Sequence, residues 1–448
     1  MTRHPPSAIL PPMNQKHMLL ITIGSAGDVY PKIGLGRALL ARGHRVTLVT
    51  SAFFEELIRA EGFDFVPLGT KEHYFNITQN PDLFHPTKGF QTIARWGLVP
   101  FTQPVIDAIE ANLADNLVVV SSGMAFGARI ARERFSFPLI SAHLQPSVLR
   151  TVYDCPDLGG FRLPDWLPHG VKRAYYNLLD KAFIDRELAG PSNQIRAQYG
   201  LAPTQHFMGD YFHSPDKVIG LFPDWYAPIQ PDWPASTVLT GFVEFDTESG
   251  DELAPDVQAF LAAGTAPIVF TAGSSNQHGH DYFAASVAAA TRLGRRAILV
   301  TRNPAAVPAQ LPEGIIHLDF VPFSRLLPHA AAIVHHGGIG TVAKSIASGV
   351  PQVITPLSHD QPDNAMRIKR LGLGAAIQPR QYNVKRATET LQSLLTDEAL
   401  LANVRAYAAR IDFAAMMAQT CDEIERTAAS FGLAKVPDRL VNSAGELQ

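Results

Sequence analysis

The sequence predicts an α/β protein with two Rossmann-like domains that face each other across a cleft. Two stretches carry this prediction: residues 17–50 and residues 333–364 each contain an apolar run, a glycine-containing turn, a helical pattern and a second apolar run. Each stretch therefore reads as a βαβ unit. The chain has 448 residues, which is long for one hydrophobic core and suits two domains.

Composition narrows the class of protein. With 46% hydrophobic and 18% charged residues, the chain resembles a folded globular protein rather than a disordered one. A net charge of −3 without a Lys/Arg cluster argues against a nucleic acid partner. Cys155 and Cys421 lie far apart, so no disulfide scaffold is indicated and a reducing cytoplasm is expected. No apolar run reaches the roughly 18–20 residues of a spanning helix, so we expect any membrane contact to be peripheral, at the inner face.

The domain boundary is expected where prolines gather. Residues 221–234, LFPDWYAPIQPDWP, contain four prolines and two tryptophans, which favours a stiff, extended connection. The start of the chain, rich in proline and without a continuous apolar core, does not look like a signal peptide. The predicted regions are a flexible leader (1–16), an N-terminal domain (17–220), a linker (221–250), a C-terminal domain (251–410) and a final helix with a tail (411–448).

The first βαβ unit places an acidic residue at the edge of a sheet. A buried parallel strand is expected over residues 17–23, followed by the loop GSAGDVYP, a helix that stops near Gly43, and a second strand at residues 45–50. Two glycines three residues apart, with no acidic residue closing the second strand, match a dinucleotide fingerprint poorly. From the carboxyl end of this strand the carboxylate of Asp28 can reach into the cleft between the domains; it can also cap the following helix, and the two roles are compatible.

Candidate acceptor contacts follow in the N-terminal domain. Between Phe53 and Phe101 many aromatic side chains lie in irregular connections, which often form binding walls but also pack as ordinary loops. Phe75 and Trp96 are the candidates from this wall, for an apolar acceptor. Ser25 in the first loop and His143 at the end of a later strand are candidate polar contacts, although His143 also fits a hydrogen-bonded core residue.

The turn of the second βαβ unit suits an anion. Glycines let the backbone approach a ligand, and the free amides of the following helix face it. Imidazole donors at the same place favour a pyrophosphate over a neutral ligand. Alternatively, the glycines serve tight packing between strand and helix. The candidate diphosphate-binding residues are His335, His336, Gly337, Gly338, Gly340 and Thr341, with Ser274 from the preceding Gly-Ser turn.

Asp360 and Gln361 come just after the second strand of this unit, where open α/β sheets bind their ligands. A carboxylate beside a carboxamide suits a sugar, whose hydroxyls both donate and accept hydrogen bonds. A candidate diphosphate-binding turn next to residues that suit sugar hydroxyls suggests that the ligand is a nucleotide sugar. Because no Asp-x-Asp pair and no His/Cys cluster at ligand spacing accompanies them, neither a metal nor another cofactor is expected.

These residues resemble a known signature. HHGGIGT, SGVP and HDQPDNA, in this order, are similar to the donor site of GT-B glycosyltransferases of the sterol, macrolide and vancomycin type, the GT1 group. The resemblance implies that His336, Gly338 and Thr341 hold the donor diphosphate, that Asp360 and Gln361 read the sugar, and that the last helix crosses back to the first domain. It also implies that Phe320 and Val321, in DFVPFSRLLPHA, lie beside the nucleobase.

The first loop resembles the GTRGDVxP element of the same family, whose aspartate is the proposed general base. Asp28 takes that position, and Ala26 replaces the arginine. Lys344 stands where plant members carry a glutamate for the ribose hydroxyls, so ribose recognition does not transfer. The linker sequence, with NPDLFHPTKGF and GSAGDVYP, looks closest to the rhamnosyltransferases of rhamnolipid synthesis.

The resemblance implies an inverting, metal-independent transfer of rhamnose or glucose from a TDP- or UDP-linked donor to a hydroxyl of a lipophilic acceptor. A hydroxyalkanoyl lipid in glycolipid or biosurfactant synthesis is the first choice, with a sterol, a carotenoid or a polyketide as alternatives. Other classes remain open at this stage. An NAD-dependent dehydrogenase would use Gly338, Gly340 and Asp360; a sugar-nucleotide epimerase would need no acceptor; and a sugar-binding module would not catalyse a reaction.

Overall fold

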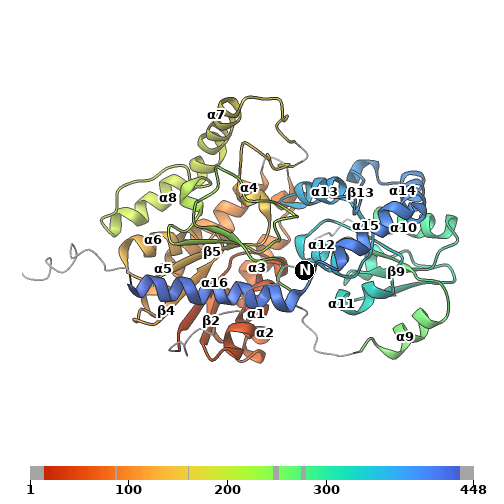
Figure 1. The fold of residues 1–448 in the computed structure, drawn as a ribbon, viewed down its shortest axis with the longest axis horizontal. Coiled ribbons are helices and arrows are strands. Elements are labelled where there is room, and N and C mark those ends of the chain that lie inside the picture. The colour runs from red at the N-terminus through yellow and green to blue at the C-terminus, as the bar shows by residue number, and fades with distance from the viewer. Residues whose placement is uncertain (1–14, 86–87, 160, 246–251, 274–278, 434–448) are drawn as a thin grey trace, which may run out of the picture.

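The computed structural model describes residues 15–85, 88–159, 161–245, 252–273 and 279–433. Most of the predicted leader, residues 1–16, therefore lies outside the described residues. Two α/β domains lie side by side, the first on the left and the second on the right of Figure 1. This is the arrangement that the two βαβ units predict.

The N-terminal domain is built on a seven-stranded parallel sheet. Strands β1, β4 and β5 are buried at every position, as expected for apolar runs covered by helices on both faces. The spatial order is β3-β2-β1-β4-β5-β6-β7, so the chain reverses direction beside β1 and β4, and their carboxyl ends mark the ligand crevice. The strands are β1 (His17–Ile21), β2 (Arg45–Ser51), β3 (Asp64–Leu68), β4 (Leu117–Ser121), β5 (Leu139–His143), β6 (Lys217–Gly220) and β7 (Thr237–Leu239).

Helices cover both faces of this sheet (Figure 1). The helices of this domain are α1 (Ala26–Ala41), α2 (Glu55–Ala60), α3 (Lys71–Thr78), α4 (Gly89–Ile93), α5 (Val99–Glu110), α6 (Phe126–Arg134), α7 (His169–Leu179) and α8 (Asp185–Gln198). Short 3₁₀ turns are η1 (Ala52–Phe54), η2 (Pro81–Phe84), η4 (Pro146–Val148) and η6 (Asp210–Phe212), and π-helical turns are η3 (Ala94–Leu98) and η5 (Asp180–Ile184).

The C-terminal domain has a six-stranded parallel sheet in the order β10-β9-β8-β11-β12-β13. Its chain reversal lies between β8 and β11, so a ligand is expected beyond the carboxyl ends of these two strands. The strands are β8 (Ile268–Thr271), β9 (Ala297–Val300), β10 (Ile315–Leu318), β11 (Ala332–His335), β12 (Gln352–Ile354) and β13 (Gly374–Ala376).

The helices of this domain and of the C-terminal region are α9 (Pro255–Ala262), α10 (His280–Arg292), α11 (Phe323–Leu326), α12 (Ile339–Ala347), α13 (Gln361–Arg370), α14 (Val384–Thr396), α15 (Glu398–Ala408) and α16 (Phe413–Leu433), with 3₁₀ turns η7 (Pro304–Ala306), η8 (Leu327–His329) and η9 (Pro379–Gln381). Among the described residues, no helix is both long enough and apolar enough to cross a bilayer.

The connection between the domains differs from the predicted linker over 221–250. β7 lies inside that range and pairs with β6, so the first sheet extends to Leu239. The proline-rich part is not a free connection either. Tyr226 and Trp233 are buried in one hydrophobic cluster with Val342 of α12. These large apolar side chains explain the difference, because burying them against α12 gains hydrophobic free energy that an exposed linker would not gain.

Helix α16 returns to the first domain and lies along α1 (Figure 1). Arg42 pairs with Asp422 (2.6 Å) and Glu425 (2.8 Å), and His44 Nε2 lies 2.9 Å from Glu425. Cys421, a free and buried thiol, belongs to the hydrophobic core of the first domain. The two domains are therefore joined twice, by the segment after β7 and by α16.

Candidate active site

Asp28 lies in the first turn of α1, beyond the carboxyl end of β1. The backbone N–H of Ser25 donates to its Oδ2 (2.9 Å), which is one half of a capping interaction. Its Oδ1 has no hydrogen-bond partner among the described residues. Gly24 makes this close approach feasible, because it has φ of +148° and a Cβ there would lie 2.1 Å from Oδ2. Asp28 thus caps the helix with one oxygen and keeps the other available.

Lys32, one turn after Asp28, is a residue of the site that sequence reasoning missed. Its side chain is buried at 1% exposure, and its Nζ donates a 3.4 Å hydrogen bond to the carbonyl of Ala142 at the end of β5. Burial lowers the pKa of Lys32 to about 7, and the charge of Asp28 opposes this change. A lysine among the apolar residues of α1 is the signal that could have revealed it.

Burial raises the pKa of Asp28 to about 6, while the hydrogen bonds from Ser25 and the positive charge of Lys32 hold it lower. Although part of the residue remains accessible, its carboxyl group is surrounded by protein atoms. A carboxylate with a pKa near 6 is ionised at neutral pH and is a better proton acceptor than an ordinary aspartate. The environment therefore suits a general base.

Aromatic side chains form a wall near Asp28. Phe53 stacks on Tyr74 at 4.3 Å and meets Phe75 edge-on at 5.4 Å between ring centroids. The charge of Asp28 contributes to the raised pKa of Tyr74, of about 12, after the larger effect of burial, so this wall lies within electrostatic reach of the carboxylate. Trp96 is exposed on η3, a turn that contacts α3, the helix of Tyr74 and Phe75.

The two polar acceptor candidates lie in different surroundings. Ser25 is partly accessible beside Asp28. His143 is buried, its Nε2 lies 3.0 Å from Nδ1 of His213, and its ring stacks on Phe212. Burial lowers the pKa of His143 well below the usual range. The His143 side chain therefore fits the core alternative and not a contact with an acceptor.

In the second domain, the neighbouring histidines of the HHGG turn differ in role. The N–H of Gly337 donates to Nδ1 of His335 (3.1 Å), so Nε2 carries the proton and donates to Oε1 of Gln352 (3.0 Å). Burial lowers the pKa of His335 to about 3. Its side chain has no donor left for a diphosphate. The expectation that His335 grips the anion does not fit this geometry, because the ring holds β11 to β12 instead.

His336 is the ring that remains available. Its Nδ1 is buried and has no hydrogen-bond partner among the described residues. Gly273 after β8 and Gly338 both border the ring, and a Cβ at either position would lie 2.7 Å from one of its nitrogens. Burial lowers the pKa of His336 to about 4. An unpaired buried polar atom costs about 1–3 kcal/mol, which a ligand could recover.

The helix beside His336 offers backbone donors. α12 starts at Ile339 after its N-cap Gly338, and the N–H of Val342 is the first to bond within the helix, to the carbonyl of Gly338. The amides of Gly340 and Thr341 precede it and are thus not used by the helix. They face outward from the carboxyl end of β11, at the chain reversal of the sheet. Ser274, predicted to join them, lies outside the described residues.

Asp360 and Gln361 lie at the N-terminus of α13. Asn364 donates to Asp360 Oδ2 (2.7 Å) and to the carbonyl of Gly337 (2.9 Å), and accepts from the hydroxyl of Tyr226 (2.9 Å). The Oε1 of Gln361 accepts from two backbone amides of the preceding loop, which leaves its amide donors for another partner. Asn364, part of HDQPDNA but not singled out from the sequence, therefore positions the acidic residue against the glycine turn.

The two carboxyl groups of the predicted site belong to different domains, Asp28 to α1 of the first and Asp360 to the N-terminus of α13 in the second. The pKa of Asp360 is raised to about 7, chiefly by burial, and the charge of Asp28 is among the further causes. The two groups therefore lie within electrostatic reach of each other. An acidic residue of the N-terminal domain, His336 and the α12 amides consequently border one region between the domains.

The remaining candidates lie at the edge of this region. The Arg302 guanidinium stands 5.1 Å over the ring of Phe320, and its charge reaches Tyr30 of the first domain. Val321 is buried in the hydrophobic core, so its side chain does not face a nucleobase and only its backbone could. Lys344 stands where the family pattern has a glutamate. Its Nζ donates to the carbonyl of Phe245 (3.4 Å), so here the side chain contacts the segment between the domains.

Comparisons with known proteins concern the chain as a whole. A model of the glycosyltransferase family 28 N-terminal domain matches residues 18–153, and a model of the erythromycin biosynthesis protein CIII-like C-terminal domain matches residues 288–424. The structure superposes on the glycosyltransferase of kitacinnamycin with a TM-score of 0.73 at 20% identity, covering 93% of this chain and 100% of that one. The chain is a nucleotide-sugar glycosyltransferase with the GT-B fold.

The glycosyltransferase is 28% identical to O-mycaminosyltylonolide 6-deoxyallosyltransferase of Streptomyces fradiae, over 86% of this chain and 91% of that one. It is 26% identical to a sterol 3-beta-glucosyltransferase of Aspergillus fumigatus over 89% of this chain, which spans 29% of that longer protein. The spinosyn rhamnosyltransferase SpnG, solved with thymidine diphosphate, superposes with a TM-score of 0.63 at 18% identity, covering 91% and 100% of the two chains. The dehydrogenase, epimerase and non-catalytic alternatives are therefore set aside.

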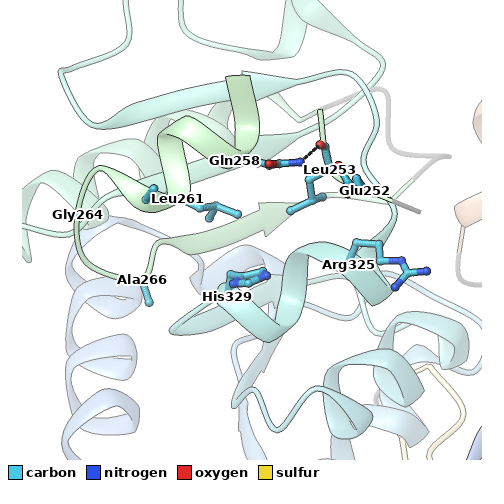
Figure 2. A pocket seen from close by; sticks show the side chains of 9 residues that line it. Glu252, Leu253, Gln258, Leu261, Gly264, Ala266, Arg325 and His329 are labelled. Atoms are coloured by element: carbon cyan, nitrogen blue, oxygen red, sulfur yellow. Dashed lines mark hydrogen bonds between the residues drawn. The ribbon is translucent and has the colours of Figure 1, made fainter. Parts of the chain in front are cut away.

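A separate hollow of the glycosyltransferase lies between α9 and the α11–η8 segment (Figure 2). In this view Gln258 bonds to the carbonyl of Leu253 (2.6 Å), and Arg325 and His329 border the opposite side. None of the predicted site residues lines it. Within the described ranges, no group of three or more His, Cys, Asp or Glu side chains is arranged to hold a metal ion.

Proposed function

We propose that this glycosyltransferase transfers rhamnose or glucose, with inversion, from a TDP- or UDP-linked donor to a hydroxyl of a lipophilic acceptor. A hydroxyalkanoyl lipid is the first choice of acceptor, so that the product is a glycolipid of the biosurfactant type. A peripheral contact with the inner face of the membrane belongs to this proposal. The likeness of the linker to rhamnolipid rhamnosyltransferases supports the sugar and the lipid, and the thymidine diphosphate bound by spinosyn rhamnosyltransferase supports the nucleotide.

The observation that supports the mechanism is the approach of α1, which carries Asp28, to α12 on the donor side: Tyr30 of α1 packs on Phe245 (5.7 Å between ring centroids), and the carbonyl of Phe245 accepts a hydrogen bond from Lys344 of α12 (3.4 Å). The charge of Asp28 is also among the causes of the raised pKa of Asp360. In this mechanism the acceptor hydroxyl gives its proton to the free oxygen of Asp28 while it attacks the anomeric carbon. The new C–O bond forms as the bond to the diphosphate oxygen breaks on the opposite face, so the configuration inverts. The nucleoside diphosphate leaves with the electron pair of that bond.

The donor side supplies binding and charge stabilisation. The amides of Gly340 and Thr341 and the ring of His336 would face the diphosphate and stabilise the charge that develops as it leaves. Asp360 and the amide donors of Gln361 would read the sugar hydroxyls, and Phe320 with Arg302 would border the nucleobase. The aromatic wall of Phe53, Tyr74 and Phe75, with Trp96, would receive the apolar part of the acceptor.

The test is a donor and acceptor panel. TDP-rhamnose, TDP-glucose and UDP-glucose are each combined with a hydroxyalkanoyl lipid, a sterol and a macrolide, and the products are identified by mass spectrometry and by the anomeric coupling in NMR. We expect an inverted glycoside of the hydroxyalkanoyl lipid. Transfer to the sterol or the macrolide alone would reject the lipid, and retention of configuration would reject the mechanism.

The role of Asp28 is tested separately by Asp28→Asn, which is nearly equal in shape but cannot accept the proton. We expect turnover to fall by roughly 10²–10⁴-fold, the usual contribution of a general base. Binding of the nucleoside diphosphate, measured by calorimetry, should stay unchanged. An unchanged turnover would reduce Asp28 to a helix cap.

A further inference from the structure

Helix α7 and the turns next to it present large apolar side chains to solvent. Val171, Leu178 and Phe183 are each at least half exposed, and Trp166, just before the helix, is 80% exposed. Val171 and Leu178 are seven residues apart and so lie on one side of α7. In Figure 1 this helix stands out from the body of the first domain. An apolar face of this kind marks a surface for a protein, a ligand or a membrane.

The exposed face does not result from a loosely attached helix. On the opposite side Tyr176 is buried, and Lys172 is buried with its Nζ bonded to the carbonyl of Val152 (3.2 Å). Asp180 is buried and pairs with Arg150 (2.6 Å). Buried charged groups attach the inner side of α7 to the domain, while its apolar side chains point to solvent. These contacts fix the orientation of the helix.

The formal charges that point outward from this helical region are positive. Arg173, Lys181 and Arg186 are exposed, and neither Arg173 nor Lys181 has an ion-pair partner in the part of the chain that the structure describes. The exposed Asp165 in the preceding loop is paired with Arg162 (2.8 Å). In a chain of net charge −3, such a local excess of cations beside aromatic and aliphatic side chains is complementary to an anionic, partly apolar partner.

The loop that leads into α7 is attached to the donor domain. Asp154 pairs with Arg370 (2.8 Å), and the N–H of Asp157 donates to Asp363 (3.2 Å) in the first turn of α13. Phe161 of the same loop is exposed. The loop before α7 therefore links the apolar face to α13, the helix that begins at the sugar-binding candidates Asp360 and Gln361.

We propose that the docking surface, formed by Trp166, Val171, Arg173, Leu178, Lys181 and Phe183, binds peripherally to membranes that contain anionic lipid. The apolar side chains would enter the interfacial layer, and the cations would face the lipid phosphates. The proposal deepens the proposed function, since a membrane is where a lipophilic acceptor would be met, but vesicle binding itself does not depend on turnover.

The full-length protein is sedimented with vesicles of phosphatidylcholine and with vesicles that also contain phosphatidylglycerol. We expect binding to the second kind, weakened by salt. Each removed cation should lower the partition coefficient about fivefold, as about 1 kcal/mol per basic residue predicts. Arg173→Ala with Lys181→Ala should therefore lower it about 25-fold. The triple variant Trp166→Ser, Leu178→Ser, Phe183→Ser should abolish binding.

Matched controls are Lys385→Ala with Arg386→Ala on α14 of the other domain, and Ile229→Ser, an exposed apolar residue of the linker region. Both controls should bind vesicles as the original protein does. Equal binding to vesicles without phosphatidylglycerol, or equal losses in the controls, would overturn the proposal. A dimer in solution that only the triple variant disrupts, without vesicle binding, would overturn it in favour of a second copy. Sugar transfer to a short, water-soluble acceptor would persist in these variants, so failure here leaves the proposed function standing.

Discussion

Replacing Lys32 by Met should stabilise the protein, because the buried amine carries a cost that an apolar side chain of similar length does not. Burial lowers the pKa of Lys32 from 10.5 to about 7. Since each pKa unit corresponds to 1.36 kcal/mol, placing the ammonium group in this site costs up to about 5 kcal/mol at or below pH 7. Relaxation around the amine reduces this figure, so we expect a gain of about 2 kcal/mol or more.

The effect of pH on the free energy of unfolding follows from the lowered pKa of Lys32. Between pH 7 and 10.5 the unfolded chain holds a proton on Lys32 that the folded chain has lost, so the stability of the original protein rises with pH in this window. The advantage of Lys32→Met should therefore be largest at or below pH 7 and shrink by up to about 1.4 kcal/mol per pH unit above it.

Equilibrium unfolding in urea at pH 7 and pH 9 measures this difference, with the exposed Lys385→Met as the control. A variant that is no more stable than the original protein, or whose advantage does not narrow at pH 9, would show that burial of the Lys32 amine does not cost stability. The same variant should move the acid limb of kcat/KM above pH 6, because the positive charge that lowers the pKa of Asp28 is gone.

Three further outcomes follow from the site. In the original protein, kcat/KM should rise with pH through about 6, as Asp28 loses its proton; a profile that is flat from pH 5 to 8 would contradict the assignment. His336→Ala should weaken nucleoside diphosphate binding about tenfold in calorimetry with little change in Tm, whereas His335→Ala should chiefly lower Tm; equal losses of affinity would argue against the distinction. Turnover should persist in EDTA, and a strict requirement for Mg²⁺ or Mn²⁺ would be inconsistent with a metal-independent mechanism.

The architecture could be predicted from the sequence because its signals are local. An apolar run, a glycine turn and a helical pattern within about 30 residues define a βαβ unit without knowledge of the rest of the chain. The same locality misled the prediction at β7. Its strand of three residues follows a proline-rich segment that looks like a linker, and only pairing with β6 makes it part of the sheet.

The site was predictable as a set of motifs but not as a set of side-chain directions. Neighbouring residues at the end of a strand point to opposite faces, so His335 and His336 had to differ, yet the sequence does not say which one faces inward. The partner that decides it, Gln352, lies on the adjacent strand. The free-energy cost of burying Lys32 could not be predicted from the sequence either, because the burial depends on β5, more than 100 residues further along the chain.

The path of α16 has a consequence for biosynthesis. During translation the first domain emerges with part of its core and of α1 uncovered, since the helix that supplies Cys421 and Ile424 to this core is made only after the second domain. The ribosome must therefore synthesise the chain through α16 before the first domain can reach its final state. A premature stop codon near residue 412 would leave an apparently intact donor domain attached to an incomplete neighbour, and such fragments should be targets for chaperones and proteases.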